Sequence, residues 1–232
     1  AMTVRRTLPH KQIRTIGAWC FVDHYGPNRQ TMAVPPHPHI GLATVTWLFD
    51  GLIYHRDSLG SAQAIAPGEL NWMTAGRGIV HSERTPAPEL ERSRKVFGLQ
   101  SWVALPKAAE GREPEFSHVA AADLPFIEDK GRSVRVVAGS LFGASSPVQT
   151  QSDLFYVDVT LQAGAKIPLP AEHVERAIYV AEGAINIAGE RHESGRLLVF
   201  REGDEIVIEA LEACRFMMLG GEPMDGPRHI WW

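Results

Sequence analysis

Two pairs of polar residues have the spacing that a metal site on β-strands would need. His37 and His39 lie two residues apart, and His81 and Glu83 repeat this spacing. Successive side chains of a strand point to opposite faces, so both members of each pair face the same side. If the two strands face each other inside a barrel, three imidazoles and one carboxylate converge. Imidazole nitrogen and carboxylate oxygen suit Fe(II), Cu(II), Ni(II), Mn(II) or Zn(II).

An internal repeat sharpens this prediction. Residues 36–39 and 168–171 share a Pro-x-Pro frame, and each is followed by an apolar run that ends in an acidic residue and a glycine, Asp50-Gly51 and Glu182-Gly183. Such a repeat indicates a duplicated β unit. In the second copy, the positions aligned with these four polar residues are all apolar: Leu169, Ala171, Ile208 and Ala210. We therefore expect one metal site, in the N-terminal half.

Short strands must position these residues, because helical periodicity is nearly absent. Alternating or apolar segments are separated by turn residues along the whole chain, at residues 43–49, 96–105, 134–138, 154–161, 177–180, 185–188, 196–200, 205–208 and 215–219. This pattern predicts an all-β fold, an antiparallel sandwich or barrel. Short helices are predicted at residues 89–94 and 120–124, and a surface loop at 106–114.

Composition excludes several classes of protein. The 232 residues carry a net charge of −4, which argues against direct binding to nucleic acid or to an anionic membrane. No apolar run reaches the roughly 18–20 residues of a membrane span, and no N-terminal signal pattern is present. We expect a cytoplasmic location. The two cysteines, Cys20 and Cys214, argue against a disulfide framework or a thiolate metal site. We expect Cys20 to be an inert, buried thiol.

The sequence resembles the pirins, a bicupin family within the cupin superfamily. The resemblance is carried by residues 21–27, 36–46, 55–60, 71–83 and 226–232. Its most specific segment is Asn-Trp-Met-Thr-Ala-Gly-Arg-Gly-Ile-Val-His-Ser-Glu, which ends at Glu83. A typical cupin has a glutamate ligand at the position of Thr44. Here Glu83 follows the last histidine instead, and this departure is the pattern of pirins.

The resemblance implies two cupin-type double-stranded β-helix barrels with few short helices. We expect an N-terminal metal-binding domain over residues 1–127 and a C-terminal domain without metal ligands over residues 128–232. One non-haem divalent ion is implied, most often Fe2+, with Cu, Ni, Co, Mn or Zn as alternatives. Its ligands fall on His37, His39, His81 and Glu83. Pirins usually continue for some tens of residues beyond the position of Trp232.

Quercetin 2,3-dioxygenase activity is the function that the resemblance implies. The partners would be a flavonol or similar aromatic enol and O2, with Glu83 as the catalytic acceptor of the substrate's hydroxyl proton. The alternative is a non-catalytic, metal- or redox-sensing regulator that acts through a protein partner, as a transcription cofactor or a regulator of a metabolic enzyme. A zinc hydrolase is disfavoured, because the sequence offers no separate general base.

Other histidines and the aromatic residues have more ordinary interpretations. Two roles are open for His24, His55 and Asp57. They could orient the ligand imidazoles through hydrogen bonds, or they could satisfy polar groups of turns and strand ends. The residues expected in the barrel core, rather than on a substrate, are Trp47, Phe49, Trp72 and Met73. The histidines without partners at ligand spacing, which we assign to the surface, are His118, His173 and His192.

Overall fold

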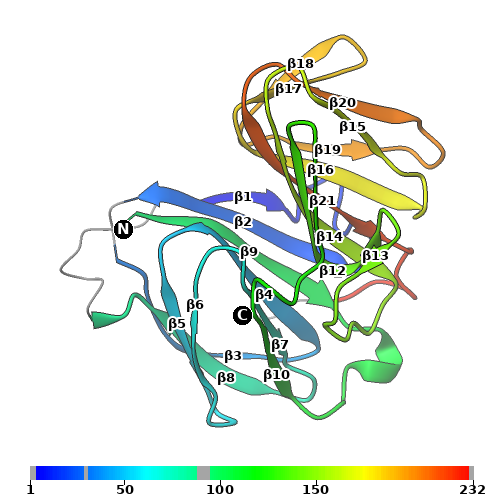
Figure 1. Cartoon of the computed structure of the whole chain (residues 1–232). Helices are drawn as coiled ribbons and strands as arrows, with labels where there is room; N and C mark the ends of the chain where they lie inside the picture. Colours follow the sequence, from blue (N-terminus) through cyan, green and yellow to red (C-terminus); the bar gives the residue numbers. More distant parts are fainter. Residues whose placement is uncertain (1–3, 29–30, 88–94, 230–232) are drawn as a thin grey trace. The chain divides into compact units, whose positions relative to one another are not determined.

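Antiparallel strands make up nearly all of the computed structural model, which describes residues 4–28, 31–87 and 95–229 (Figure 1). The predicted all-β fold class is confirmed. The helix predicted at residues 120–124 is wrong, because these residues form a turn that ends at Pro125. A segment of five residues is too short to form a stable helix, and the proline that follows disfavours helical geometry at the residue before it. The predicted loop at 106–114 contains a short 3-10 helix, η1 (Lys107–Ala109). The helix predicted at 89–94 lies outside the described residues.

The chain divides into two compact units, and the first comprises Ala1–Arg14, Trp19–Ala121 and Asp225–Trp232. Its six-stranded sheet has the order β1 (Val4–Leu8), β2 (Trp19–Asn28), β9 (Val96–Ala104), β4 (Leu42–Asp50), β7 (Leu70–Thr74) and β10 (Glu115–Val119). Its four-stranded sheet has the order β3 (Ala33–His39), β8 (Ile79–Arg84), β5 (Ile53–Asp57) and β6 (Ala62–Ile65). The two sheets enclose the interior of a barrel.

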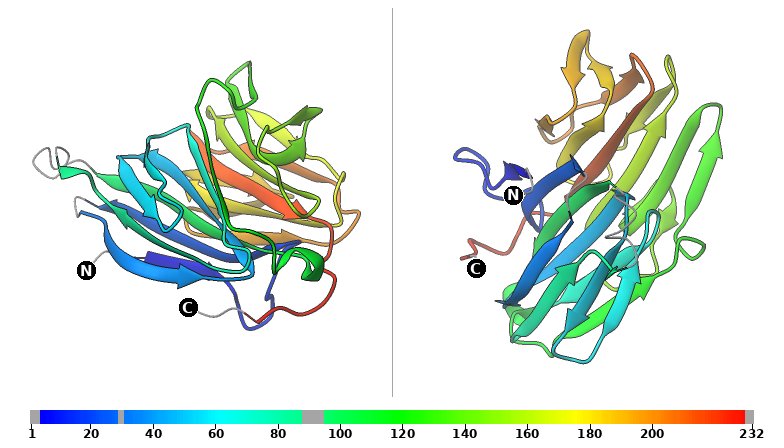
Figure 2. Two further views of the ribbon diagram at one scale, coloured as in Figure 1. Left: turned by 90° about the horizontal axis from the view of Figure 1, so that it is seen from below. Right: turned by 90° about the vertical axis from the view of Figure 1, so that its left-hand side faces the viewer.

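The second unit comprises Thr15–Ala18 and Ala122–Met224. Its larger sheet has the order β11 (Phe126–Asp129), β12 (Arg132–Leu141), β14 (Leu154–Leu161), β21 (Cys214–Gly221), β16 (Glu175–Glu182) and β19 (Leu197–Phe200), with β13 (Ala144–Ser145) paired to β12. Its smaller sheet has the order β15 (Lys166–Leu169), β20 (Ile206–Ala210), β17 (Ala184–Ile187) and β18 (Glu190–Glu193). Within this unit, β14, β21 and β16 lie side by side in both views of Figure 2. The boundary expected after residue 127 stays a prediction.

The strand orders of the two units correspond. The run β1-β2-β9-β4-β7 of the first unit matches β12-β14-β21-β16-β19 of the second, and β3-β8-β5-β6 matches β15-β20-β17-β18. Each of these nine strands therefore has a counterpart in the other unit, whereas β10, β11 and β13 have none among the described strands. This correspondence is what a duplicated β unit predicts.

Strand pairing corrects one detail of the repeat. His37 pairs with His81, whereas Ile208 pairs with Ile167 rather than with Leu169. The structural counterparts of the two β3 histidines are therefore Ile167 and Leu169, two residues before the positions given by the Pro-x-Pro alignment. Ile167, Leu169 and Ile208 all belong to the buried apolar core of the second unit. Ala171 lies beyond the end of β15 and is exposed.

Apolar side chains fill the interior away from the polar pairs. The expected core residues are buried, with relative exposures of 0% for Trp47, 8% for Phe49, 3% for Trp72 and 1% for Met73. Cys20 is buried as well, and burial raises the pKa of its thiol to about 12. A thiol with that pKa is inert at neutral pH. The helical structure described in this chain includes no segment long and apolar enough to span a membrane.

Candidate metal centre

Three adjacent strands each present one pair of polar residues to the interior of the first barrel. The pairs are His37 and His39 on β3, His55 and Asp57 on β5, and His81 and Glu83 on β8. The middle strand β8 alternates as a half-buried strand should, with His81 and Glu83 buried and Val80 and Arg84 exposed. In register, His81 lies between His37 and Asp57 of the neighbouring strands.

The three predicted histidine ligands form one cluster. His37, His39 and His81 each offer a ring nitrogen, and these nitrogens all lie within 4.8 Å of one another. The Nε2 atoms of His39 and His81 are 3.1 Å apart. Two nitrogens bound to one ion at about 2.1 Å, at roughly a right angle, would lie about 3 Å apart. The spacing of this pair therefore fits a shared metal ion.

Burial keeps two of these imidazoles neutral. It lowers the pKa of His39 to about 4, with the neighbouring His37 adding to the effect. Burial, together with the charges of His39, His37 and His55, lowers the pKa of His81 to about 2. Neutral imidazole is the form that binds a metal, so both rings hold the required protonation state at neutral pH.

Glu83 lies beside the histidine cluster with a partner of its own. Its Oε1 atom accepts a hydrogen bond of 2.8 Å from the hydroxyl of Thr46 on β4. A carboxylate oxygen of Glu83 and ring nitrogens of His55 and His81 form a second group within 4.8 Å. Burial raises the pKa of Glu83, and the hydrogen bond from Thr46 opposes that shift. The structure thus gives two overlapping groups that share His81, and the four-ligand set stays a prediction.

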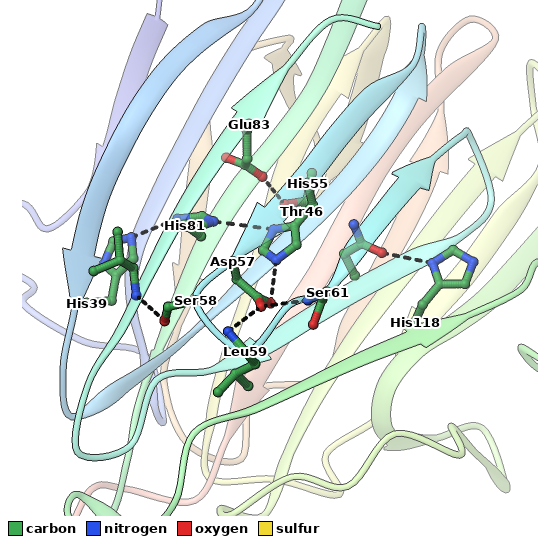
Figure 3. A network of polar contacts seen from close by, with 12 residues as sticks. His39, Thr46, His55, Asp57, Ser58, Leu59, Ser61, His81, Glu83 and His118 are labelled. Carbon is green, nitrogen blue, oxygen red and sulfur yellow. Dashed lines mark hydrogen bonds and ion pairs between the residues drawn. The ribbon is translucent and has the colours of Figure 1, made fainter.

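A chain of polar contacts leads from Asp57 to the cluster (Figure 3). His55 Nε2 lies 2.9 Å from Asp57 Oδ2, and His55 Nδ1 lies 3.4 Å from His81 Nδ1. Because a carboxylate only accepts, His55 Nε2 carries the proton and donates it. In the neutral ring, Nδ1 of His55 then accepts from Nδ1 of His81. This assignment leaves the Nε2 lone pair of His81 directed at the cluster, as ligation requires.

The surroundings of Asp57 and His55 hold this contact chain in place. Burial opposes ionisation of Asp57, but hydrogen bonds from His55, Ser61 and Leu59 outweigh it and lower the pKa of Asp57. Phe116 of β10 stacks on the His55 ring, with centroids 4.3 Å apart and planes 14° apart. The prediction that His55 and Asp57 could orient ligand imidazoles therefore has direct geometric support.

An open cavity of about 180 Å³ lies next to the cluster. Its lining includes the four predicted ligands together with Tyr25, Gln100 and Trp102. Trp102 stacks on Phe21, another lining residue, with centroids 3.9 Å apart, and it meets His39 edge-on. Sequence reasoning missed these wall residues, although the alternation of strand 96–105 could have placed Gln100 and Trp102 on one face.

The other candidates lie elsewhere. His24 packs against Phe97, while its neighbours Asp23 and Tyr25 line the cavity from the opposite face of β2. His118 contacts Asn71 through a hydrogen bond of 2.8 Å. His173, assigned to the surface from the sequence, is 8% exposed and thus buried, so that assignment is wrong.

Comparison with known proteins decides the family. The Pirin family pattern matches residues 1–103, and the pattern of the Pirin C-terminal cupin domain matches residues 156–232. A pirin-like protein of Caulobacter vibrioides is 45% identical, over 99% of this chain and 81% of that protein. This chain belongs to the pirin family. The resemblance inferred from the sequence is confirmed.

Two further similarities within and around the pirins concern activity. A Pseudomonas aeruginosa protein, named provisionally as a quercetin 2,3-dioxygenase, is 37% identical over 100% of this chain and 73% of its own length. The crystal structure of a quercetin 2,3-dioxygenase from Acinetobacter baumannii superposes with a TM-score of 0.87 at 36% identity. That match covers 99% of this chain and 77% of the other.

Proposed function

We propose that this pirin is a metal-dependent dioxygenase of the quercetin 2,3-dioxygenase type, which opens the ring of a flavonol or a similar aromatic enol with O2. The observation that carries the proposal is that His37, His39, His81 and Glu83 together line one open cavity. These four residues would hold one divalent ion, for which Fe2+ is our first choice. The similarity to quercetin 2,3-dioxygenases supports the same activity.

The metal would supply acidity at the substrate. A bound divalent ion lowers the pKa of a coordinated hydroxyl, as it lowers that of bound water. We assign to Glu83 the role of accepting the released proton. It is 6% exposed, and in the metal-free protein burial raises its pKa above that of an exposed glutamate. A pKa raised toward the working pH suits a general base.

Thr46 can form a hydrogen bond with Glu83 in both protonation states of the carboxyl group. Its Oγ1 atom lies 2.8 Å from Glu83 Oε1 and 3.1 Å from Gln100 Oε1. While Glu83 is ionised, the single hydroxyl proton of Thr46 points to the carboxylate. Once Glu83 is protonated, its O–H donates to Thr46, and Thr46 can donate to Gln100 instead. The three side chains would hold the proton at Glu83 without leaving a buried group unpaired.

The cavity limits how a substrate can bind. At about 180 Å³ it is smaller than the roughly 300–1,000 Å³ of pockets that enclose a drug-sized ligand. A flavonol would therefore insert its hydroxyl-bearing edge and leave the rest of its rings at the mouth. The flat pair formed by Phe21 and Trp102 offers an aromatic wall beside the cluster. This geometry favours planar enols over bulky substrates.

The experiment is turnover of quercetin by the intact protein loaded separately with Fe, Cu, Ni, Co or Mn, followed by the loss of visible absorbance. We expect turnover with at least one metal. Glu83→Gln should lower it by about 100-fold or more while most of the metal stays bound. Glu113→Gln is the matched control, because Glu113 is 74% exposed and pairs with Arg77 on the surface. If none of the five metals supports turnover, the proposal is wrong and the non-catalytic regulator is favoured.

A further inference from the structure

A second group of potential metal ligands lies in the C-terminal unit. Asp153 directly precedes β14, Glu222 directly follows β21, and His173 lies two residues before β16. These three strands are neighbours in one sheet, in the order β14-β21-β16. Their pairing places all three residues at the same end, and the backbone N–H of Glu222 donates to the carbonyl of Asp153 at 3.0 Å. The sheet therefore fixes where the three side chains meet.

The tautomer of His173 follows from its surroundings. Its Nε2 atom lies 3.3 Å from the carbonyl oxygen of Ser140. A carbonyl only accepts, so Nε2 carries a proton and the neutral ring presents a bare lone pair at Nδ1. The His173 ring also packs on Phe155, with centroids 4.9 Å apart. The ring is thus held in one orientation.

Nδ1 of His173 is aimed at two carboxylates. It lies 3.7 Å from Asp153 Oδ1 and 3.9 Å from Glu222 Oε1, both too far for a hydrogen bond. No hydrogen-bond partner for this atom exists among the residues described by the structure, although His173 is only 8% exposed. A buried polar atom without a partner destabilises the folded state. Something positively charged between these three groups would remove that cost.

The donor set matches a divalent transition metal. The three ligand atoms lie within 4.8 Å of one another, and two atoms bound to one ion at about 2.1 Å can be at most about 4.2 Å apart. The side chains of Asp153 and Glu222 are 67% and 45% exposed, so small rotations can close the remaining gap. Zinc takes imidazole nitrogen and carboxylate oxygen as ligands, and three protein ligands leave its fourth position to water.

We propose that Asp153, His173 and Glu222 bind one divalent cation of the zinc class, in addition to any ion at the N-terminal cluster. The site does not restore the cupin ligands, because the second unit has buried Ile167, Leu169 and Ile208 at those positions. An ion there would join the ends of β14, β16 and β21 and stabilise the second unit. This inference does not depend on dioxygenase activity.

The test uses the intact chain and zinc as the probe. Equilibrium dialysis at pH 7.5 with elemental analysis measures zinc per chain in the wild type and in the double variant Asp153→Asn/Glu222→Gln. We expect the double variant to bind one equivalent of zinc fewer than the wild type. The matched control is Glu190→Gln/Glu193→Gln, which removes two carboxylates from β18 in the same unit and should lose none.

A second measurement reports on His173 directly. Zinc should shift the nitrogen NMR signal of His173 Nδ1 in the wild type, and it should leave that signal unchanged in the double variant. Equal zinc content in the wild type and the double variant would overturn the proposal. The three groups would then be an ion pair between protonated His173 and two carboxylates. The exposed carboxyl-to-amide changes keep the test valid even if a direct substitution of His173 fails to fold.

Discussion

Asp57 accepts a hydrogen bond of 2.9 Å from His55, and both side chains are almost fully removed from solvent, at 0% and 3% exposure. The contact fixes which nitrogen of His55 carries the proton, and through His55 it orients His81. The carboxylate of Asp57 thus orients a ring of the histidine cluster without contacting the predicted metal position. A direct consequence is that a residue outside the predicted ligand set should control metal affinity.

Asp57→Asn should weaken metal binding at the cluster by about 10–100-fold, the range typical for loss of an outer-shell partner. An amide can donate as well as accept, so His55 loses its fixed tautomer. Competition with a chromophoric chelator measures the affinity, and nitrogen NMR of the metal-free protein should show a mixture of His81 tautomers. Asp123→Asn, in an exposed turn, is the control. Unchanged affinity together with an unchanged His81 tautomer would contradict the role given to Asp57.

Thr46→Val should raise the pKa of Glu83, because the hydrogen bond from Thr46 lowers it. A hydrogen bond to a charged group contributes about 1.5–3 kcal/mol, which corresponds to a shift of about one to two pH units. The acidic limb of the pH profile of kcat/KM should move to higher pH by that amount. Thr46→Ser keeps the hydroxyl and should restore the wild-type profile. Identical profiles for the valine and serine variants would count against the Thr46–Glu83 contact.

Without metal, the protein should lose stability as the pH falls from about 6.5 toward 4. The folded-state pKa of His39 is about 4 and that of His81 about 2, both below the ordinary value near 6.5. In this window the unfolded chain takes up protons that the folded chain refuses, so the free energy of unfolding decreases. Urea unfolding at several pH values measures the slope.

His24, whose pKa burial lowers to about 4, adds to the same slope. Glu83 acts in the opposite sense, because its raised pKa makes the folded state bind a proton more readily than the unfolded state. Glu83→Gln should therefore make the decline with falling pH steeper. A flat stability curve between pH 6.5 and 4 would contradict the assigned histidine states.

Gly51 and Gly60 form a matched pair for testing the turn after β4. Their φ angles are +95° and +92°, but a Cβ on Gly51 would lie 2.6 Å from the carbonyl oxygen of Lys95, whereas a Cβ on Gly60 meets no described atom within 4 Å. Gly60→Ala should cost only the backbone strain, about 1 kcal/mol. Gly51→Ala should cost about 1–3 kcal/mol more, because the chain must also shift. Equal losses in urea unfolding would show that crowding at Gly51 has no effect.

The sequence by itself determined the face on which the histidines lie. The i, i+2 spacing of His37 with His39 and of His81 with Glu83 is enough, because side chains alternate along any extended strand. Turn residues between short apolar segments likewise predict an all-β chain, and each of the nine predicted segments coincides with a strand to within a few residues. The apolar character of the second copy also followed from residue types alone.

Tertiary structure decided which pairs meet. Strand order places β8 between β3 and β5, and this order brings Asp57 and His55, more than twenty residues before His81, into the contact chain. It also buries His173 beside Asp153 and Glu222, although the sequence predicts a surface position. Pairing register shifted the match of β3 with β15 by two residues. Such contacts depend on long-range pairing of strand edges, which local spacing and residue propensity do not encode.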